Sequence, residues 1–168
     1  DPKMSRTANR AIPTGKVGPK SALAFGTGIS ALGVSWFYYL SNSVAAFWSA
    51  FSVLFYVFVY SMWLKRGTPQ NIVIGGIAGS TPPVIGWAAS EDSLAISTDS
   101  VQSAIESVID LGSLMPWFMF VLIFLWTPPH FWALALYRSE EYAEVGVPMM
   151  PNVKGAERTI SEMKIYCV

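Results

Sequence analysis

The sequence predicts an all-α fold, a polytopic transmembrane helix bundle with four spans. Only 13% of the 168 residues are charged, whereas a soluble domain carries about 25% charged residues. Charged side chains are absent from three long stretches, residues 21–64, 67–90 and 111–137. A soluble helix shows a polar face, and these stretches show almost none, so they favour a lipid bilayer over a buried soluble core.

Four helices account for these stretches. Residues 21–64 are too long for one span, which needs about 20 residues, and suit two spans joined by a tight turn. The polar triplet at residues 41–43 supplies that turn. The other two stretches suit one span each. We therefore expect membrane helices at about residues 21–40, 44–64, 72–89 and 112–136.

The loops between the helices differ in charge. If all four helices span, segments 1–20, 65–66 and 137–168 lie on one side of the membrane. They hold all 11 basic residues and six of the 11 acidic residues. The opposite side, with the turn and loop 90–110, holds five acidic residues and no basic one. The positive-inside rule then places both termini in the cytoplasm or in the equivalent matrix compartment.

Loop 90–110 predicts a short helix of its own. Four of its apolar residues recur at helical spacing: Val101, Ile105, Val108 and Ile109. This pattern is typical of an interfacial helix, and Asp99 is the expected N-cap.

Composition excludes several classes of protein. The 11 basic and 11 acidic residues give zero net charge, which argues against a nucleic-acid partner. The single cysteine, Cys167, excludes an intrachain disulfide and a cysteine-cluster metal site. The chain has no initiator methionine or signal peptide and stops soon after the fourth helix. We therefore expect a fragment of a larger polytopic protein.

The first basic loop contains residues that suit a phosphate group. Arg6 and Arg10 are four residues apart, so a helix would place them on one face, with Lys3 nearby. Guanidinium groups match phosphate oxygens, and Asp1 could bind a hard cation such as Mg²⁺. The alternative is a juxtamembrane loop that contacts lipid phosphates. The second loop, residues 65–71, also contains basic residues. They could bind phosphate, or they could only anchor the membrane topology.

The third basic stretch includes the only histidine, His130, within a membrane helix. Intramembrane ionisable groups are candidates for a functional site. If the helix continues past residue 137, one stripe carries His130, Leu134, Tyr137 and Glu141, with His130 about 16 Å below Glu141. That geometry suits a ligand with an anionic head and an apolar body. The alternatives are a histidine hydrogen-bonded to a neighbouring helix and a solvated helix end that bears Glu140, Glu141 and Glu144.

Glycine and proline residues predict packing features of the helices. Gly75 and Gly79 form a small-xxx-small pair, which lets helices approach closely. Pro82–Pro83 and Pro128–Pro129 should kink the third and fourth helices.

Four motifs resemble one known family in the same order along nearly the whole chain. DPKMSRTANR at residues 1–10 looks like the end of the first Asp-rich motif of UbiA-type intramembrane prenyltransferases. The pattern DxxMxRTxxR is typical of their protoheme IX farnesyltransferase (heme O synthase) branch. KRGTPQNIVIGG with PPVIGW, WTPPHFW and YAEVGVPMMP at residues 65–76, 82–87, 126–132 and 142–151 are similar to that branch as well.

The resemblance implies a fold and an activity. The four spans would be helices three to six of a nine-helix bundle, and residues 1–168 a partial prenyltransferase domain that is inactive alone. Its basic loops 1–20, 65–71 and 137–155 would carry the active site. The activity would be Mg²⁺-dependent transfer of a farnesyl group from farnesyl diphosphate to a vinyl group of protoheme IX (heme B), giving heme O and diphosphate. The membrane would be a bacterial plasma membrane or a mitochondrial inner membrane.

The resemblance also assigns roles to residues. Asp1, Arg6 and Arg10 would be catalytic, and the diphosphate would be held by Lys3, Arg6, Arg10, Lys65 and Arg66. Asp1, Glu140 and Glu141 would bind the metal, although family members often have Asp at the second position of that acidic pair. His130 and Tyr137 would bind heme. Heme A synthase or a terminal oxidase would be the assembly partners, beside the lipid bilayer.

Three other functions are kept open. A prenyltransferase of the same fold could act on a quinone precursor or a chlorophyll-type acceptor. A transporter or lipid-binding protein also uses kinked helices and midplane polar groups, and Mg²⁺ dependence would distinguish it. A structural subunit could bind heme through His130 without releasing diphosphate.

Overall fold

The computed structural model describes residues 5–144, 146 and 148–166, and for residues 5, 6, 66, 141 and 144 the backbone alone. This part of the chain is all-helical, without a strand. Its elements are α1 (Ser5–Ala8), α2 (Pro19–Leu40), α3 (Ser43–Leu54), a π-helical continuation η1 (Phe55–Leu64), α4 (Lys65–Gly67), α5 (Asn71–Ser80), α6 (Pro82–Ser90), α7 (Val101–Ile109), α8 (Met115–Tyr137), α9 (Ser139–Glu144), α10 (Met150–Lys154) and α11 (Ala156–Tyr166).

Four of the helical segments are long and apolar enough to cross a membrane, at residues 19–40, 43–64, 71–90 and 115–137. The prediction of an all-α bundle with four spans is therefore confirmed. The fourth span begins three residues later than expected, because a turn precedes it. Asp110 Oδ1 accepts the Gly112 N–H at 3.0 Å, and Gly112 has a φ of 71° that favours glycine.

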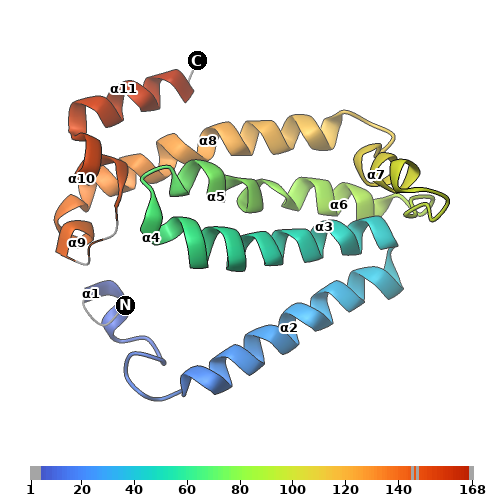
Figure 1. Ribbon diagram of the computed structural model, residues 1–168, viewed down its shortest axis with the longest axis horizontal. Coiled ribbons are helices and arrows are strands. Elements are labelled where there is room, and N and C mark those ends of the chain that lie inside the picture. The colour runs from blue at the N-terminus through green and yellow to red at the C-terminus, as the bar shows by residue number, and fades with distance from the viewer. Residues whose placement is uncertain (1–4, 145, 147, 167–168) are drawn as a thin grey trace.

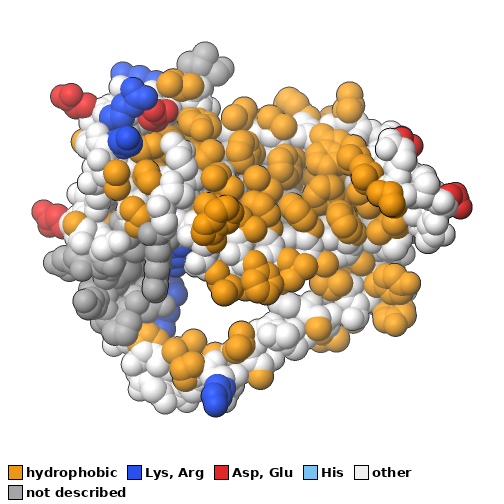
Figure 2. All heavy atoms as spheres, in the orientation of Figure 1, with side chains coloured by type: hydrophobic (Ala, Val, Ile, Leu, Met, Phe, Trp, Pro, Cys, Tyr) orange, Lys and Arg blue, Asp and Glu red, His pale blue; other side chains and the backbone are white. Residues whose placement is uncertain are grey.

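Three spans pack together and the first diverges from them (Figure 1). α5 packs on α8 and η1, and α6 packs on α3 and α8. α2 packs on α3 and has no buried residue. Figure 2 shows open space between α2 and the rest of the bundle, bordered by hydrophobic side chains.

The two ends of the bundle differ in the elements and charges they carry. α1, α4, α9, α10 and α11 gather at one end, with the Lys and Arg side chains, and we call it the basic end (Figures 1 and 2). The opposite end carries α7 and acidic side chains, and we call it the acidic end. On the face that Figure 2 shows, hydrophobic side chains gather between the two ends, as expected of a bilayer-spanning region.

Each end has its own cluster of buried hydrophobic residues. α3, α6 and the start of the 111–114 turn contribute one cluster: Val44, Ala45, Val84, Ala88 and Leu111. At the basic end, Ile72 of α5, Ala135 of α8 and Met149 pack together with Tyr142 against them. The second cluster attaches the segment after α8 to the membrane helices, and so fixes the basic end.

The third span is interrupted at its proline pair, as expected. α5 ends at Ser80 and α6 begins at Pro82. At the break, Thr81 Oγ1 donates to the Ala78 carbonyl at 2.8 Å, and the hydroxyl oxygens of Thr81 and Ser52 of α3 lie 2.8 Å apart within hydrogen-bond distance. The bond to the Ala78 carbonyl replaces the backbone bond that Pro82 cannot donate. The helix α8 continues through Pro128 and Pro129 to Tyr137.

Only one member of the expected small-residue pair lies at a helix contact. A Cβ on Gly75 would collide with the Tyr60 ring of η1, so this glycine is required for the approach of α5 to η1. Gly79 has nothing within 4 Å of such a Cβ. Its neighbour Gly76 takes its place, since a Cβ there would lie 3.4 Å from Thr127 of α8.

The expected helix in loop 90–110 is present as α7. The prediction that Asp99 is its N-cap is wrong. Ser100 is the N-cap, and its Oγ accepts the Ser103 N–H at 3.1 Å. Asp99 lies one residue too early and instead accepts from Ser97 Oγ at 3.2 Å. Three indole N–H groups donate to carbonyls beside the end of α7, at 2.9–3.2 Å: Trp48 to Val108, Trp117 to Ile109 and Trp87 to Leu111.

Candidate functional site

The N-terminal segment brings α1 to the basic end (Figure 1). Asp1 and Lys3 lie outside the described residues, as does the side chain of Arg6. Arg10 is exposed and follows α1 in a turn, where its N–H donates to the Thr7 carbonyl at 3.1 Å. Because α1 ends at Ala8, Arg6 and Arg10 do not share one helix, which is the condition on which the expected common face rested.

The loop between the second and third spans is a compact turn that presents Lys65. Lys65 is exposed at the start of α4, and the side chain of Arg66 is outside the described part. The Thr68 carbonyl accepts the Asn71 N–H at 3.2 Å, and Asn71 Nδ2 donates to the Lys65 carbonyl at 3.4 Å. Asn71 thereby holds the backbone of Lys65 against the start of α5.

Asn71 is a buried polar residue that no sequence motif singles out. It is 1% exposed, and its Oδ1 is buried without a hydrogen-bond partner in the described part of the chain. A buried amide oxygen usually has a partner, so this one is open to a donor. A lone polar residue at the first position of an apolar stretch was the available signal.

His130 lies on the exposed side of α8. Its ring stacks on Trp126, with centroids 4.2 Å apart and planes 19° from parallel. Phe131 contacts it in a T-shaped arrangement at 5.5 Å. Pro128, Pro129 and Trp132 are buried, whereas Trp126, His130 and Phe131 are exposed. No hydrogen bond joins His130 to a neighbouring helix within the described residues.

The end of α8 opens into a surface cavity. Four consecutive residues, Tyr137, Arg138, Ser139 and Glu140, line a volume of about 510 Å³. Tyr137 is 85% exposed, and Glu140 is exposed as well. The cavity places a phenol, a guanidinium and a carboxylate at the basic end, directly beyond the helix that carries His130.

The expected stripe from His130 to Glu141 is interrupted. α8 ends at Tyr137, because Arg138 leaves the helical conformation with φ −117° and ψ 30°. Ser139 then begins α9, and its carbonyl accepts from Asn152 Nδ2 at 3.0 Å. His130, Leu134 and Tyr137 share one helix, while Glu140 and Glu141 belong to the next. The side chain of Glu141 lies outside the described part.

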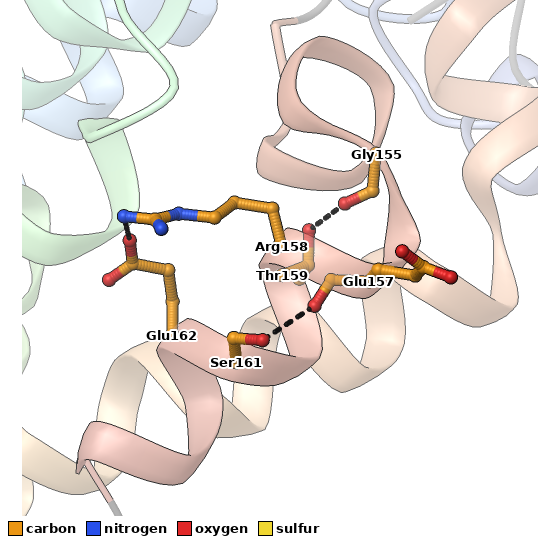
Figure 3. A network of polar contacts seen from close by, with 6 residues as sticks. All are labelled: Gly155, Glu157, Arg158, Thr159, Ser161 and Glu162. Carbon is orange, nitrogen blue, oxygen red and sulfur yellow. Dashed lines mark hydrogen bonds and ion pairs between the residues drawn. The ribbon is translucent and has the colours of Figure 1, made fainter.

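The basic residue Arg158 of α11 is engaged within its own helix (Figure 3). Its Nη2 lies 2.7 Å from Glu162 Oε1, one turn away. On the same helix, Thr159 Oγ1 donates to the Gly155 carbonyl at 2.8 Å. Tyr166 packs edge-on against Trp132 at 5.6 Å and holds α11 along α8. Arg158 is therefore a weaker candidate than Arg10 and Lys65 for binding an anion.

The carboxylates at the basic end have the chemistry of hard-cation ligands. Within the described residues, no group of three or more His, Cys, Asp or Glu side chains could hold a metal ion. Mg²⁺ commonly binds through one or two carboxylates together with substrate phosphates. The exposed Glu140 meets that requirement, and Asp1 and the side chain of Glu141 lie outside the described part.

Comparison with known proteins relates the whole chain to one family. The model of the UbiA prenyltransferase family matches residues 1–168. Proteins named protoheme IX farnesyltransferase from Beijerinckia indica and Parvibaculum lavamentivorans are each 49% identical over 166 residues, which cover 99% of this chain and 46% of each relative. Protoheme IX farnesyltransferase 1 of Mesorhizobium japonicum is 47% identical over 168 residues, covering 100% of this chain and 48% of that protein.

The chain thus spans about half the length of the curated relatives that it matches. No solved structure matches it.

Proposed function

This chain belongs to the UbiA prenyltransferase family, and we propose that the protein containing it transfers a farnesyl group from farnesyl diphosphate to a vinyl group of protoheme IX. The observation that carries the proposal is the arrangement along α8. An exposed, aromatic face with His130 leads to a polar cavity at the basic end, lined by Tyr137 and Glu140. An amphiphilic ligand with an anionic end matches that order of surfaces. The names of the relatives, protoheme IX farnesyltransferase, support protoheme IX as the proposed acceptor.

The diphosphate belongs at the basic end. Arg10 and Lys65 are exposed there on two different loops, and Lys3, Arg6 and Arg66 come from the same two loops. Guanidinium groups bind phosphate oxygens in a bidentate manner, and ammonium groups act as point charges. These cations stabilise negative charge that develops on the leaving diphosphate, which is the usual role of charged groups in such a step.

A magnesium ion fits the same region. Asp1, Glu140 and Glu141 would hold it, since carboxylate oxygens are its preferred protein ligands. When bound, Mg²⁺ neutralises charge on the diphosphate and so favours its departure.

The acceptor heme belongs along the exposed face of α8. In the reaction, the allylic carbon–oxygen bond of farnesyl diphosphate breaks, and a vinyl group forms a bond to the freed carbon. Water then adds to the resulting cation and releases a proton, which gives a hydroxyethylfarnesyl substituent. His130 would orient the porphyrin, and Tyr137, at the mouth of the cavity, would face its polar edge. The apolar surroundings exclude water from the cation until the carbon–carbon bond has formed.

The proposal is tested with the full-length protein in membranes. Heme B, farnesyl diphosphate and Mg²⁺ are added, and mass spectrometry identifies heme that carries a hydroxyethylfarnesyl group. We expect that product, and we expect EDTA to abolish it. Arg10→Ala should lower kcat/KM at least about tenfold, as expected for a lost charge-assisted contact to phosphate. Lys16→Ala is the matched control, an exposed cation in the same loop, and should leave turnover unchanged.

Other outcomes of this assay would favour a different function. Prenylation of an added phenolic acid in place of heme would retain the family and move the enzyme to quinone precursors. Heme binding without turnover of either acceptor, in folded protein, would favour a heme-binding or transport role. Heme A synthase and a terminal oxidase remain the proposed partners if heme O is the product.

A further inference from the structure

The contact between Trp126 and His130 defines how the imidazole is presented. The two rings lie one helical turn apart on α8 and stack at 4.2 Å with planes 19° from parallel. Phe131 adds a T-shaped contact at 88°. A histidine on an exposed helix face otherwise samples several rotamers. The stack selects one of them, because rotation of the imidazole away from the indole would lose the contact.

The stack leaves the ring nitrogens available. The lone pair of an imidazole nitrogen lies in the plane of the ring, so a partner on one ring face does not block it. Within the described residues, neither nitrogen of His130 has a hydrogen-bond partner. An intramembrane histidine whose nitrogens are free and whose orientation is restrained is suited to binding a ligand atom along the ring plane.

We infer that Trp126 is a positioning residue, which holds the His130 imidazole so that a ring nitrogen binds the iron of the acceptor heme. The inference rests on the proposed function. A nitrogen–iron bond sets the position of the porphyrin against α8, and therefore of the vinyl group that reacts. Imidazole is a common axial ligand of heme iron. Trp126, 57% exposed beside it, also offers an apolar surface to the porphyrin edge.

The test compares two porphyrins that differ only in the metal. Purified full-length protein in lipid nanodiscs is titrated with protoheme and with metal-free protoporphyrin IX, and absorption spectra report ligation of the iron. The wild-type protein should bind protoheme at least about tenfold more tightly, with the spectrum of a histidine-ligated heme. His130→Ala should abolish both the preference and the spectrum, and added imidazole should restore the spectrum.

Variants of Trp126 distinguish stacking of its ring on His130 from the mere presence of a large apolar side chain. Trp126→Leu retains an apolar side chain without the ring, and should reduce the preference for protoheme roughly threefold to tenfold, the range expected for a lost aromatic pair. Trp126→Phe retains a stacking ring and should recover most of the preference. Trp36→Ala is the matched control, because Trp36 is 63% exposed on α2, far from His130 in the chain, and should behave as the wild-type protein.

The outcomes distinguish this inference from the proposed function. If the wild-type protein forms farnesylated heme while His130→Ala keeps the protoheme preference, the inference is overturned and the function stands. If Trp126→Leu alone keeps the preference and spectrum, His130 binds iron without help from Trp126, which also overturns the positioning role. If no farnesylated heme forms but the preference follows His130 and Trp126, the function fails and the ligation geometry is supported.

Discussion

At the scale of single residues, Asn42 connects two parts of the chain that are distant in sequence. Its Oδ1 accepts the Ala45 N–H at 2.8 Å and caps α3. Its Nδ2 donates to the carbonyls of Ala88 and Glu91 at 2.6 and 3.1 Å, at the end of α6. The residue is 8% exposed, so water cannot easily replace these bonds.

Asn42→Ala should therefore destabilise the protein by about 2 kcal/mol, because it removes the cap of α3 and both side-chain hydrogen bonds to the end of α6. The free energy of unfolding in a denaturant titration of the detergent-solubilised full-length protein measures the effect. Ser41→Ala is the control in the same turn and should change it by less than about 0.5 kcal/mol. Equal destabilisation by both variants would show that the turn, and not the Asn42 bonds, is what matters.

The sequence predicted Asn42 only as part of a turn. Its bonds to α6 join Asn42 to Ala88 and Glu91, which lie 46 and 49 positions further along the chain. No local pattern encodes such a contact. The same holds for Asn71, whose burial depends on neighbours that the fold supplies. His130, in contrast, stood out in the sequence because an ionisable residue within a span is rare.

At the scale of elements, the approach of α5 to η1 depends on Gly75. Spacing alone predicted Gly75 and Gly79 as a pair, but the Tyr60 ring lies against the first and open space lies beside the second. A small-xxx-small pattern identifies a helix with room on one face, and the rotation of that helix decides which member meets a neighbour.

Gly75→Ala should destabilise the bundle by about 1–3 kcal/mol, since the added methyl group overlaps the Tyr60 ring and forces the helices apart. Gly79→Ala should not destabilise it. Truncation of the ring in the double variant Gly75→Ala/Tyr60→Ala should recover part of the loss relative to the sum of the single variants. Thermal unfolding of the four proteins in the same detergent measures this coupling, and strict additivity would refute the contact.

The chain also breaks after α8, where helical phase predicted that the helix continues. Helical phase predicted one stripe from His130 to Glu141, and the helix instead ends at Tyr137. The second hydrophobic cluster draws Met149 and Tyr142 onto Ile72 and Ala135, and the chain must turn after Tyr137 to reach them. Periodicity within a segment cannot show that a later segment folds back on it.

At the scale of the whole molecule, charge separation between the two ends predicts an orientation in the membrane. The loop at the acidic end contains no basic residue, and the Lys and Arg residues within the described part of the chain lie in segments that meet at the opposite end or lead to it. From the positive-inside rule we predict that the basic end, with its candidate site, faces the cytoplasm or matrix.

Single cysteines test this orientation in the full-length protein from which native cysteines, including Cys167, have been removed. A membrane-impermeant maleimide should label Asp92→Cys in intact cells, because this exposed residue lies at the acidic end. Lys16→Cys should react only after the membrane is permeabilised. The opposite pattern would invert the orientation and place the candidate site outside.

The membrane class, the four spans and the charge of each end follow from the sequence alone, because the cost of burying charge in lipid acts on every residue whatever its neighbours. The residues that carry the motifs are likewise readable from the chain. The stacking of Trp126 on His130 within one helix depends on side-chain rotamers, whereas the rotation of α5 and the end of α8 depend on contacts between segments. Such contacts are settled by packing of the whole bundle, so only the tertiary structure determines which candidates share a surface.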